Sequence, residues 1–238
     1  MNYDLVETRE CFNIIFLLDT SISMSGERIG QLNNAMQDVL NDLHTLSIEM
    51  STDAFVRIIQ FNSDANWIVG DAKNGVLALE AANSWRSLSA SGSTNTAAAI
   101  EKSLEALHIS YLGRKNRKPV VVLVTDGFSN DASATRNATE KLKKALSGDS
   151  GKEKVYRVGV GVIGYNEAEL VDFASTGKIV EDNEIKAGTP LVFKVDDVSD
   201  LANVIRDVAV SSLRSVIADN GSDEDSTLVI NRTTEDKW

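Results

Sequence analysis

The chain has 238 residues, with 24 Lys and Arg against 35 Asp and Glu, which gives a formal net charge of −11 at pH 7. This excess of negative charge argues against non-specific nucleic-acid binding, which depends on cationic side chains that neutralise phosphates. It favours cations or basic partners. One cysteine, Cys11, excludes an intramolecular disulfide framework and a Cys-based zinc cluster, and the two histidines offer little for a His-based one.

The first ten residues include acidic side chains and precede a short apolar run over 12–18. A secretory signal instead begins with basic residues and has a longer apolar stretch. No window of the sequence approaches the ~20 apolar residues that a membrane span needs. We therefore expect a soluble, cytoplasmic protein that does not bind membranes.

In the first half of the chain, a continuous apolar run indicates a strand buried on both faces, and apolar residues at helical spacing follow it. In chain order, we expect a strand over 12–19, a helix over 27–46, a strand over 54–61, a hairpin partner over 66–70, a short helix and a loop within 71–93, and a helix over 96–109.

The second half repeats this alternation. We expect a strand over 120–124, a helix over 134–146, a strand over 156–162, a helix over 167–174, a strand over 190–195, and a helix over 200–213 that Ser199 caps. Strands that alternate with helices imply parallel strands joined by crossovers, with helices on both faces. The sequence therefore predicts a Rossmann-like, doubly wound α/β fold with a mostly parallel central sheet.

We predict one domain over 1–217 and an acidic, flexible tail over 218–238, where the composition shifts to Asn, Gly, Ser, Asp and Glu. Within this tail, Leu228–Ile230 is apolar enough to dock somewhere.

Three polar segments are expected at the carboxyl ends of the strands, where open parallel sheets bind ligands. Asp19, Ser21 and Ser23 follow the first strand, Thr94 precedes the helix over 96–109, and Asp126 follows the strand over 120–124. Each segment alone is also typical of a helix cap or a tight turn. Together, two carboxylates and three hydroxyls indicate a hard-cation site, which suits Mg²⁺ or Mn²⁺ better than Zn²⁺.

The pattern Asp19-x-Ser21-x-Ser23, followed by Thr94 and by Asp126-Gly127, resembles the metal-ion-dependent adhesion site (MIDAS) of von Willebrand factor A (vWA) domains. The resemblance covers about residues 10–214, and the chain looks most similar to intracellular bacterial tellurium-resistance-associated (TerY-like) vWA proteins. It implies that Ser21 and Ser23 bind the metal through their hydroxyls and that Thr94 binds it directly or through water. Asp19 and Asp126 would hold ordered waters and the serine hydroxyls.

Two residues depart from the pattern of that family. Ser93 stands where the family has glycine, and Phe128 stands where a polar residue is common. Phe128 is either a contact for a partner or a packed residue of its loop. Thr96 is an alternative ligand to Thr94, because both flank Asn95.

The resemblance implies a non-enzymatic, divalent-metal-dependent interaction module in a bacterial stress-response system. A protein partner would supply an Asp or Glu to the open position on the metal. One alternative is a Mg²⁺- or Mn²⁺-dependent phosphohydrolase in which Asp126 acts as base or nucleophile. Another is self-association, in which Asp223, Glu224 and Asp225 of the tail occupy the metal site of a second copy.

The remaining motifs favour structural roles. The glycines of 159–164 match GxGxxG but are expected inside a strand, whereas a dinucleotide site needs them between strand and helix. Glycine in a strand allows a helix to approach closely. We interpret His44 and His108 as ordinary helix residues, Cys11 as a structural thiol and the basic run 114–118 as a solvated loop.

Overall fold

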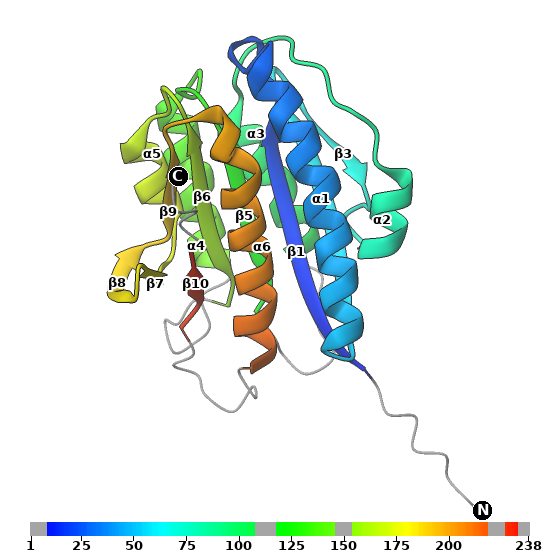
Figure 1. The fold of residues 1–238 in the computed structure, drawn as a ribbon. Helices are drawn as coiled ribbons and strands as arrows, with labels where there is room; N and C mark the ends of the chain where they lie inside the picture. Colours follow the sequence, from blue (N-terminus) through cyan, green and yellow to red (C-terminus); the bar gives the residue numbers. More distant parts are fainter. Residues whose placement is uncertain (1–8, 108–117, 146–153, 219–226, 233–238) are drawn as a thin grey trace, which may run out of the picture.

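A mostly parallel sheet forms the middle layer of the fold (Figure 1). The computed structural model describes residues 9–107, 118–145, 154–218 and 227–232. Its main sheet has the order β3-β2-β1-β5-β6-β9, and β4 also pairs with β2. The strands are β1 (Glu10–Asp19), β2 (Thr52–Phe61), β3 (Ala65–Val69), β4 (Val76–Leu77), β5 (Val120–Thr125), β6 (Tyr156–Val162) and β9 (Val192–Val195). Only β3 and β4 run antiparallel to their neighbour, so the predicted fold class is confirmed for the described residues.

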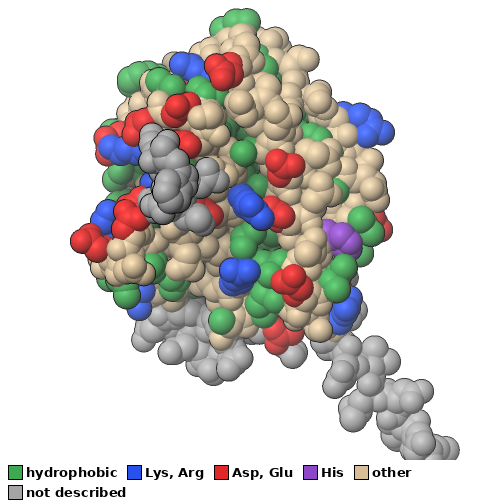
Figure 2. All heavy atoms as spheres, in the orientation of Figure 1, with side chains coloured by type: hydrophobic (Ala, Val, Ile, Leu, Met, Phe, Trp, Pro, Cys, Tyr) green, Lys and Arg blue, Asp and Glu red, His purple; other side chains and the backbone are tan. Residues whose placement is uncertain are grey.

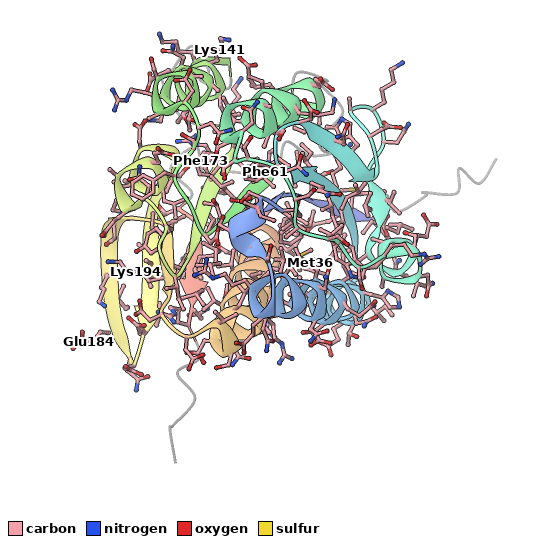
Figure 3. The ribbon with its side chains drawn as sticks, turned by 90° about the horizontal axis from the view of Figure 1, so that it is seen from above. Met36, Phe61, Lys141, Phe173, Glu184 and Lys194 are labelled. Carbon is pink, nitrogen blue, oxygen red and sulfur yellow. The ribbon has the colours of Figure 1, made fainter. Side chains whose placement is uncertain are left out.

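Helices cover both faces of this sheet. One face carries α1 (Glu27–Glu49), α2 (Ala78–Ser84) and α6 (Leu201–Ala218), and the other carries α3 (Thr96–Leu107), α4 (Ala132–Ala145) and α5 (Glu167–Phe173). Seen from above in Figure 3, Met36 lies on the α1 side of the sheet, and Phe61 and Phe173 lie on the other. Along β1, Ile14 and Phe16 pack into the first layer while Ile15 and Leu17 pack into the second, and all four are fully buried. This double burial explains the continuous apolar run of β1.

A second, three-stranded sheet was not predicted. It consists of β7 (Thr176–Glu181), β8 (Glu184–Pro190) and β10 (Val229–Asn231) in the order β10-β7-β8. The strands β7 and β8 form a hairpin whose turn residues Asp182 and Asn183 have φ of 50° and 64°. Asp and Asn tolerate this left-handed region better than other residues, and paired turn residues of this kind are a recognised hairpin signal.

The strand β10 binds the carboxyl-terminal segment to the domain. Leu228 and Ile230 are fully buried in the cluster beneath α1 and α6, and the Asn231 backbone N–H donates to Ser211 Oγ at 3.0 Å. The expected docking of this segment is confirmed, and 228–231 belongs to the packed fold. Most of the predicted tail, including Asp223, Glu224 and Asp225, lies outside the described residues, so the boundary at 217 stays a prediction.

Two further expectations concern local structure. Ser199 does not cap the last helix: the Asp197 side chain accepts from the Ser199 backbone N–H, and a 3₁₀ turn, η2 (Val198–Asp200), precedes α6. The Asp197 carboxylate therefore caps the 3₁₀ turn, and Ser199 Oγ donates to the same carboxylate oxygen at 2.8 Å. The glycine interpretation is confirmed at Gly159, where a Cβ would lie 3.1 Å from the Leu170 side chain of α5. At Gly161, a Cβ would lie 2.4 Å from the ring of Tyr165, in the loop before that helix.

The polar surface is mixed in sign. Figure 2 shows acidic and basic side chains interspersed over the face that carries α1 and α6. Within the described ranges, none of the helices combines the length and apolar character needed to span a bilayer. His108 and residues 114–117 of the basic run lie outside the described residues.

Candidate metal centre

Three loops meet at the carboxyl edge of β1 and β5, the upper edge in Figure 1. Because β1 and β5 are parallel neighbours with Leu18 opposite Val124, Asp19 and Thr125 end their strands at the same level. Thr125 Oγ1 donates to Asp19 Oδ2 at 2.6 Å, which joins the two strand ends. The short turn η1 (Ile22–Met24) lies between β1 and α1 at this edge.

Asp19 is fully buried at the centre of this edge. Its Oδ1 accepts from the Ser21 backbone N–H at 2.8 Å, and its Oδ2 accepts from Thr125. Burial raises the pKa of Asp19, the hydrogen bonds from Thr125 and Ser21 oppose this effect, and the charge of Asp126 adds to it. A buried carboxylate near a second carboxylate creates a location where a cation is stabilised.

A chain of hydrogen bonds connects Ser21, Ser23 and Asp126. Ser21 Oγ and Ser23 Oγ lie 2.9 Å apart, and Ser23 Oγ donates to Asp126 Oδ1 at 2.7 Å. Because Ser23 donates its proton to Asp126, Ser21 is the donor within the serine pair. Each serine oxygen therefore keeps a lone pair that can face a cation. The other carboxylate oxygen of Asp126, Oδ2, accepts from Arg28 Nη1 of α1.

Thr94 reaches the same place from the loop before α3. A Cβ on Gly127 would lie 3.8 Å from both Thr94 Oγ1 and Ser23 Oγ, so both hydroxyls lie beside Gly127. The Thr94 backbone is fixed by Asn130, whose side-chain oxygen accepts from Thr94 N at 3.1 Å and whose N–H donates to Thr94 O at 2.8 Å. The structure thus brings together all five residues that the sequence singled out.

The geometry favours Thr94 over Thr96 as a ligand. Both threonines are buried, but Thr96 is the first residue of α3, whereas Thr94 Oγ1 lies beside Gly127 and is near the same point as Ser23 Oγ. The unusual Ser93 turns toward a different loop: its N–H donates to Ser63 Oγ at 3.1 Å, and the two hydroxyls lie 3.2 Å apart.

Exposed apolar side chains surround this edge. Ile22 is 64% exposed between the two serines, and Phe128 is 66% exposed two residues after Asp126. An ideal Cβ on Gly164 would lie 3.5 Å from the carbonyl oxygen of Asp126. This contact brings the neighbouring, partly exposed Ile163 to the same edge. The exposure of Phe128 contradicts the reading of this residue as loop packing.

The donor set suits a hard divalent cation. Across the described ranges, no group of three or more His, Cys, Asp or Glu side chains is placed to hold a metal. The candidate site instead combines two carboxylates with hydroxyls, and all of its donor atoms are oxygens. Oxygen ligands of this kind are typical of Mg²⁺ and Mn²⁺ sites.

Sequence reasoning missed two residues of this edge. Thr125, between the predicted strand and Asp126, was not singled out, although its hydroxyl binds Asp19. Arg28 was not considered, although it follows Ser23 by five residues and its guanidinium binds Asp126. The position of Arg28 in the first turn of α1, close in sequence to the Asp-x-Ser-x-Ser segment, was the available signal.

Comparison with known proteins identifies the family. The model of the von Willebrand factor type A domain matches residues 13–207. The chain is 26% identical to inter-alpha-trypsin inhibitor heavy chain H1 of Sus scrofa over 180 residues, which is 72% of this chain and 19% of that protein. It therefore spans about a fifth of the length of this curated relative.

Two solved structures share the fold. Proximal thread matrix protein 1 from the mussel byssus, with a zinc-occupied MIDAS motif, superimposes with a TM-score of 0.58 at 19% identity, covering 85% of this chain and 45% of that one. A von Willebrand factor type A protein from Catenulispora acidiphila gives a TM-score of 0.59 at 16% identity, covering 84% and 42%. Together with the family match over most of the sequence, the observed α/β architecture shows that the chain belongs to the von Willebrand factor type A domain family.

Proposed function

We propose that this domain is a non-enzymatic protein–protein interaction module that binds Mg²⁺ or Mn²⁺ at the carboxyl edge of β1 and β5 and captures an Asp or Glu of a partner through the metal. The observation that carries the proposal is the hydrogen-bonded chain from Ser21 through Ser23 to Asp126, beside the buried Asp19. These hydrogen bonds hold neutral hydroxyls and two carboxylates around one position.

Each residue has a defined role in this proposal. Ser21 and Ser23 bind the metal through their hydroxyls, and Thr94 binds it directly or through water. Asp19 and Asp126 fix the serines and hold ordered waters, in keeping with their present hydrogen bonds to Ser21 and Ser23. The metal supplies an electrophilic centre, and because hydroxyl ligands are neutral they leave it attractive to an incoming carboxylate.

The contacts of the two carboxylates favour an interaction module over the alternative phosphohydrolase. Both oxygens of Asp19 accept hydrogen bonds from Ser21 and Thr125, and both oxygens of Asp126 accept from Ser23 and Arg28. These contacts give both carboxylates a positioning role, in which they hold Ser21, Ser23 and the end of β5, as the interaction module requires. Metal-dependent phosphoester turnover that is lost in Asp126→Ala would establish the enzymatic alternative instead.

The exposed Ile22 and Phe128 support a protein as the ligand. Large apolar side chains beside a polar site are typical of a surface that a partner covers, and aromatic side chains are enriched in interfaces. We propose that the partner packs an apolar side chain here, next to its metal-binding carboxylate.

The wider setting of the proposal rests on the resemblance to TerY-like proteins. On that resemblance alone, we propose that the domain acts in the cytoplasm, within a bacterial stress-response system similar to tellurium resistance. Self-association through the acidic tail is a separate proposal, and replacement of Asp223, Glu224 and Asp225 by Asn, Gln and Asn would test it by dissolving oligomers. The zinc at the MIDAS of the mussel protein makes Zn²⁺ the metal to compare with Mg²⁺ and Mn²⁺.

Affinity capture from the native cell extract tests the function. The wild-type chain with Mg²⁺ should retain a partner that EDTA releases, and Ser21→Ala should retain none. Ser25→Ala is the matched control, because Ser25 is exposed in the same loop. Its hydroxyl donates to the Ile22 carbonyl oxygen and takes no part in the hydrogen bonds that link Ser21, Ser23 and Asp126. A partner that survives both EDTA and Ser21→Ala would contradict capture through a metal.

A further inference from the structure

Arg28 places a cation on one carboxylate of the proposed metal site. Its Nη1 donates to Asp126 Oδ2 and also to the Ser23 backbone carbonyl oxygen, the latter at 3.2 Å. The side chain of Asp126 is fully buried, and that of Arg28 is 29% exposed. The guanidinium is therefore fixed between two of the residues that the metal would use.

This ion pair differs from an ordinary pair on the surface of the helices that cover the same face of the sheet. Arg206 of α6 binds Asp42 of α1 at 2.7 Å, but the two side chains are 58% and 30% exposed. Water screens such an exposed pair, so it contributes little. Charges around a buried carboxylate are screened less, so the charge of Arg28 acts strongly on any ion bound beside Asp126.

The charge balance of the site follows from these contacts. Asp19 and Asp126 are the two carboxylates, and Arg28 offsets one of them. A dication at Ser21 and Ser23 is then attracted by one net negative charge instead of two. Arg28 also donates to one oxygen of Asp126, so this oxygen is less available to a metal and its waters.

We propose that Arg28 is an internal counter-cation of this site: it competes with the divalent metal for Asp126, weakens metal binding, and keeps the buried carboxylate paired. The inference rests on the proposed metal site and adds a residue that sets its affinity. Such a site has a higher dissociation constant for the metal than a site with two uncompensated carboxylates. Its metal occupancy therefore changes with the free metal concentration over a higher range.

The test measures binding of Mn²⁺ alone to the full chain, by electron paramagnetic resonance of the free ion. Arg28→Gln removes the charge and keeps a side chain of similar shape, and we expect it to bind Mn²⁺ about tenfold more tightly than the wild type. In EDTA, its thermal midpoint should fall below that of the wild type, because Asp126 loses its cation. Arg28→Lys keeps the charge and should stay within about threefold of the wild-type dissociation constant.

Arg206→Gln serves as the matched control, because it removes an ion-paired arginine on the same side of the sheet and should leave Mn²⁺ binding unchanged. If Arg28→Gln unfolds in EDTA, the protein can be kept loaded with Mn²⁺ and its affinity measured by competition with a chelator of known strength. An Arg28→Gln dissociation constant equal to or weaker than that of the wild type overturns the inference. So does equal tightening in Arg28→Lys, because charge would then not be the cause.

The proposed function fails in a different way. Wild-type protein that binds no Mn²⁺, or Ser21→Ala that binds it as the wild type does, would refute the metal site itself. Wild-type binding that depends on Ser21 but not on Arg28 would refute the counter-cation alone.

Discussion

Asp19→Asn separates the structural role of this residue from its charge. The amide keeps the size of the side chain: its oxygen can accept from the Ser21 N–H, and its NH₂ can donate to Thr125 Oγ1. The replacement removes a buried negative charge whose pKa burial has raised. We therefore expect the stability in EDTA to change by no more than about 1 kcal/mol, while stabilisation by metal is lost.

The size of the lost effect follows from linkage. At a Mg²⁺ concentration about 100 times its dissociation constant, binding to the native state alone stabilises the wild type by about 2.7 kcal/mol. In a domain of this length, 1 kcal/mol shifts the thermal midpoint by about 2–4 °C. Excess Mg²⁺ should raise the wild-type midpoint by roughly 5–11 °C, and that of Asp19→Asn by a small fraction of this.

Differential scanning calorimetry in EDTA and in excess MgCl₂ measures both quantities. Asp42→Asn is the control, because Asp42 is a partly exposed acid of α1 that pairs with Arg206 away from the site. It should keep the full wild-type response to Mg²⁺. An equal midpoint rise in Asp19→Asn and in the wild type would refute the reasoning that Asp19 belongs to a metal site.

The remaining predictions concern pH, the partner surface and the packing. Because the pKa of Asp19 is raised above its usual 3.8, the native state holds the proton of this carboxyl more tightly than the unfolded state does. In EDTA, the wild type should therefore lose stability relative to Asp19→Asn as pH rises from below 3.8 through the raised value. Urea unfolding measures this, and a stability difference between the two proteins that stays constant across this pH range would contradict it. Phe128→Ala should weaken partner capture in a pull-down titration but leave the Mn²⁺ affinity unchanged, because the ring is 66% exposed; a change in Mn²⁺ affinity would argue for a role in the metal site instead. Gly161→Ala should cost about 1–3 kcal/mol in guanidinium unfolding, because its Cβ would meet the Tyr165 ring, and wild-type stability would show that the ring moves freely. Leu228→Ala should cost about 2–5 kcal/mol in the same assay, since the side chain is fully buried; a loss well under 1 kcal/mol would show that β10 is dispensable.

The main sheet was predictable from the sequence because burial on both faces leaves an unmistakable pattern. In β1 and β5 nearly every residue is buried, and only a strand between two helical layers removes consecutive side chains from water. The hairpin of β7 and β8 left no such pattern, since most of β8 is exposed and stands apart from the main sheet. Its turn at Asp182 and Asn183 was the available indication.

The candidate site was predictable to the extent that spacing determines it. Parallel strands end at one edge, so Asp19 and Asp126 had to come close once their strands were neighbours. The choice between Thr94 and Thr96 needed the position of Gly127 in three dimensions. The closeness of Arg28 to the Asp-x-Ser-x-Ser segment was a signal for its presence at this edge, but its pairing with Asp126 depends on one side-chain conformation that links residues 98 positions apart.

The most direct test of the central claim is the anomalous scattering of crystals grown with Mn²⁺. We expect one strong peak at the carboxyl edge of β1 and β5, within direct bonding distance of the Ser21 and Ser23 hydroxyls, and no such peak in Ser21→Ala crystals. A wild-type structure with no manganese at this edge, or with manganese held by residues other than these, would contradict the account.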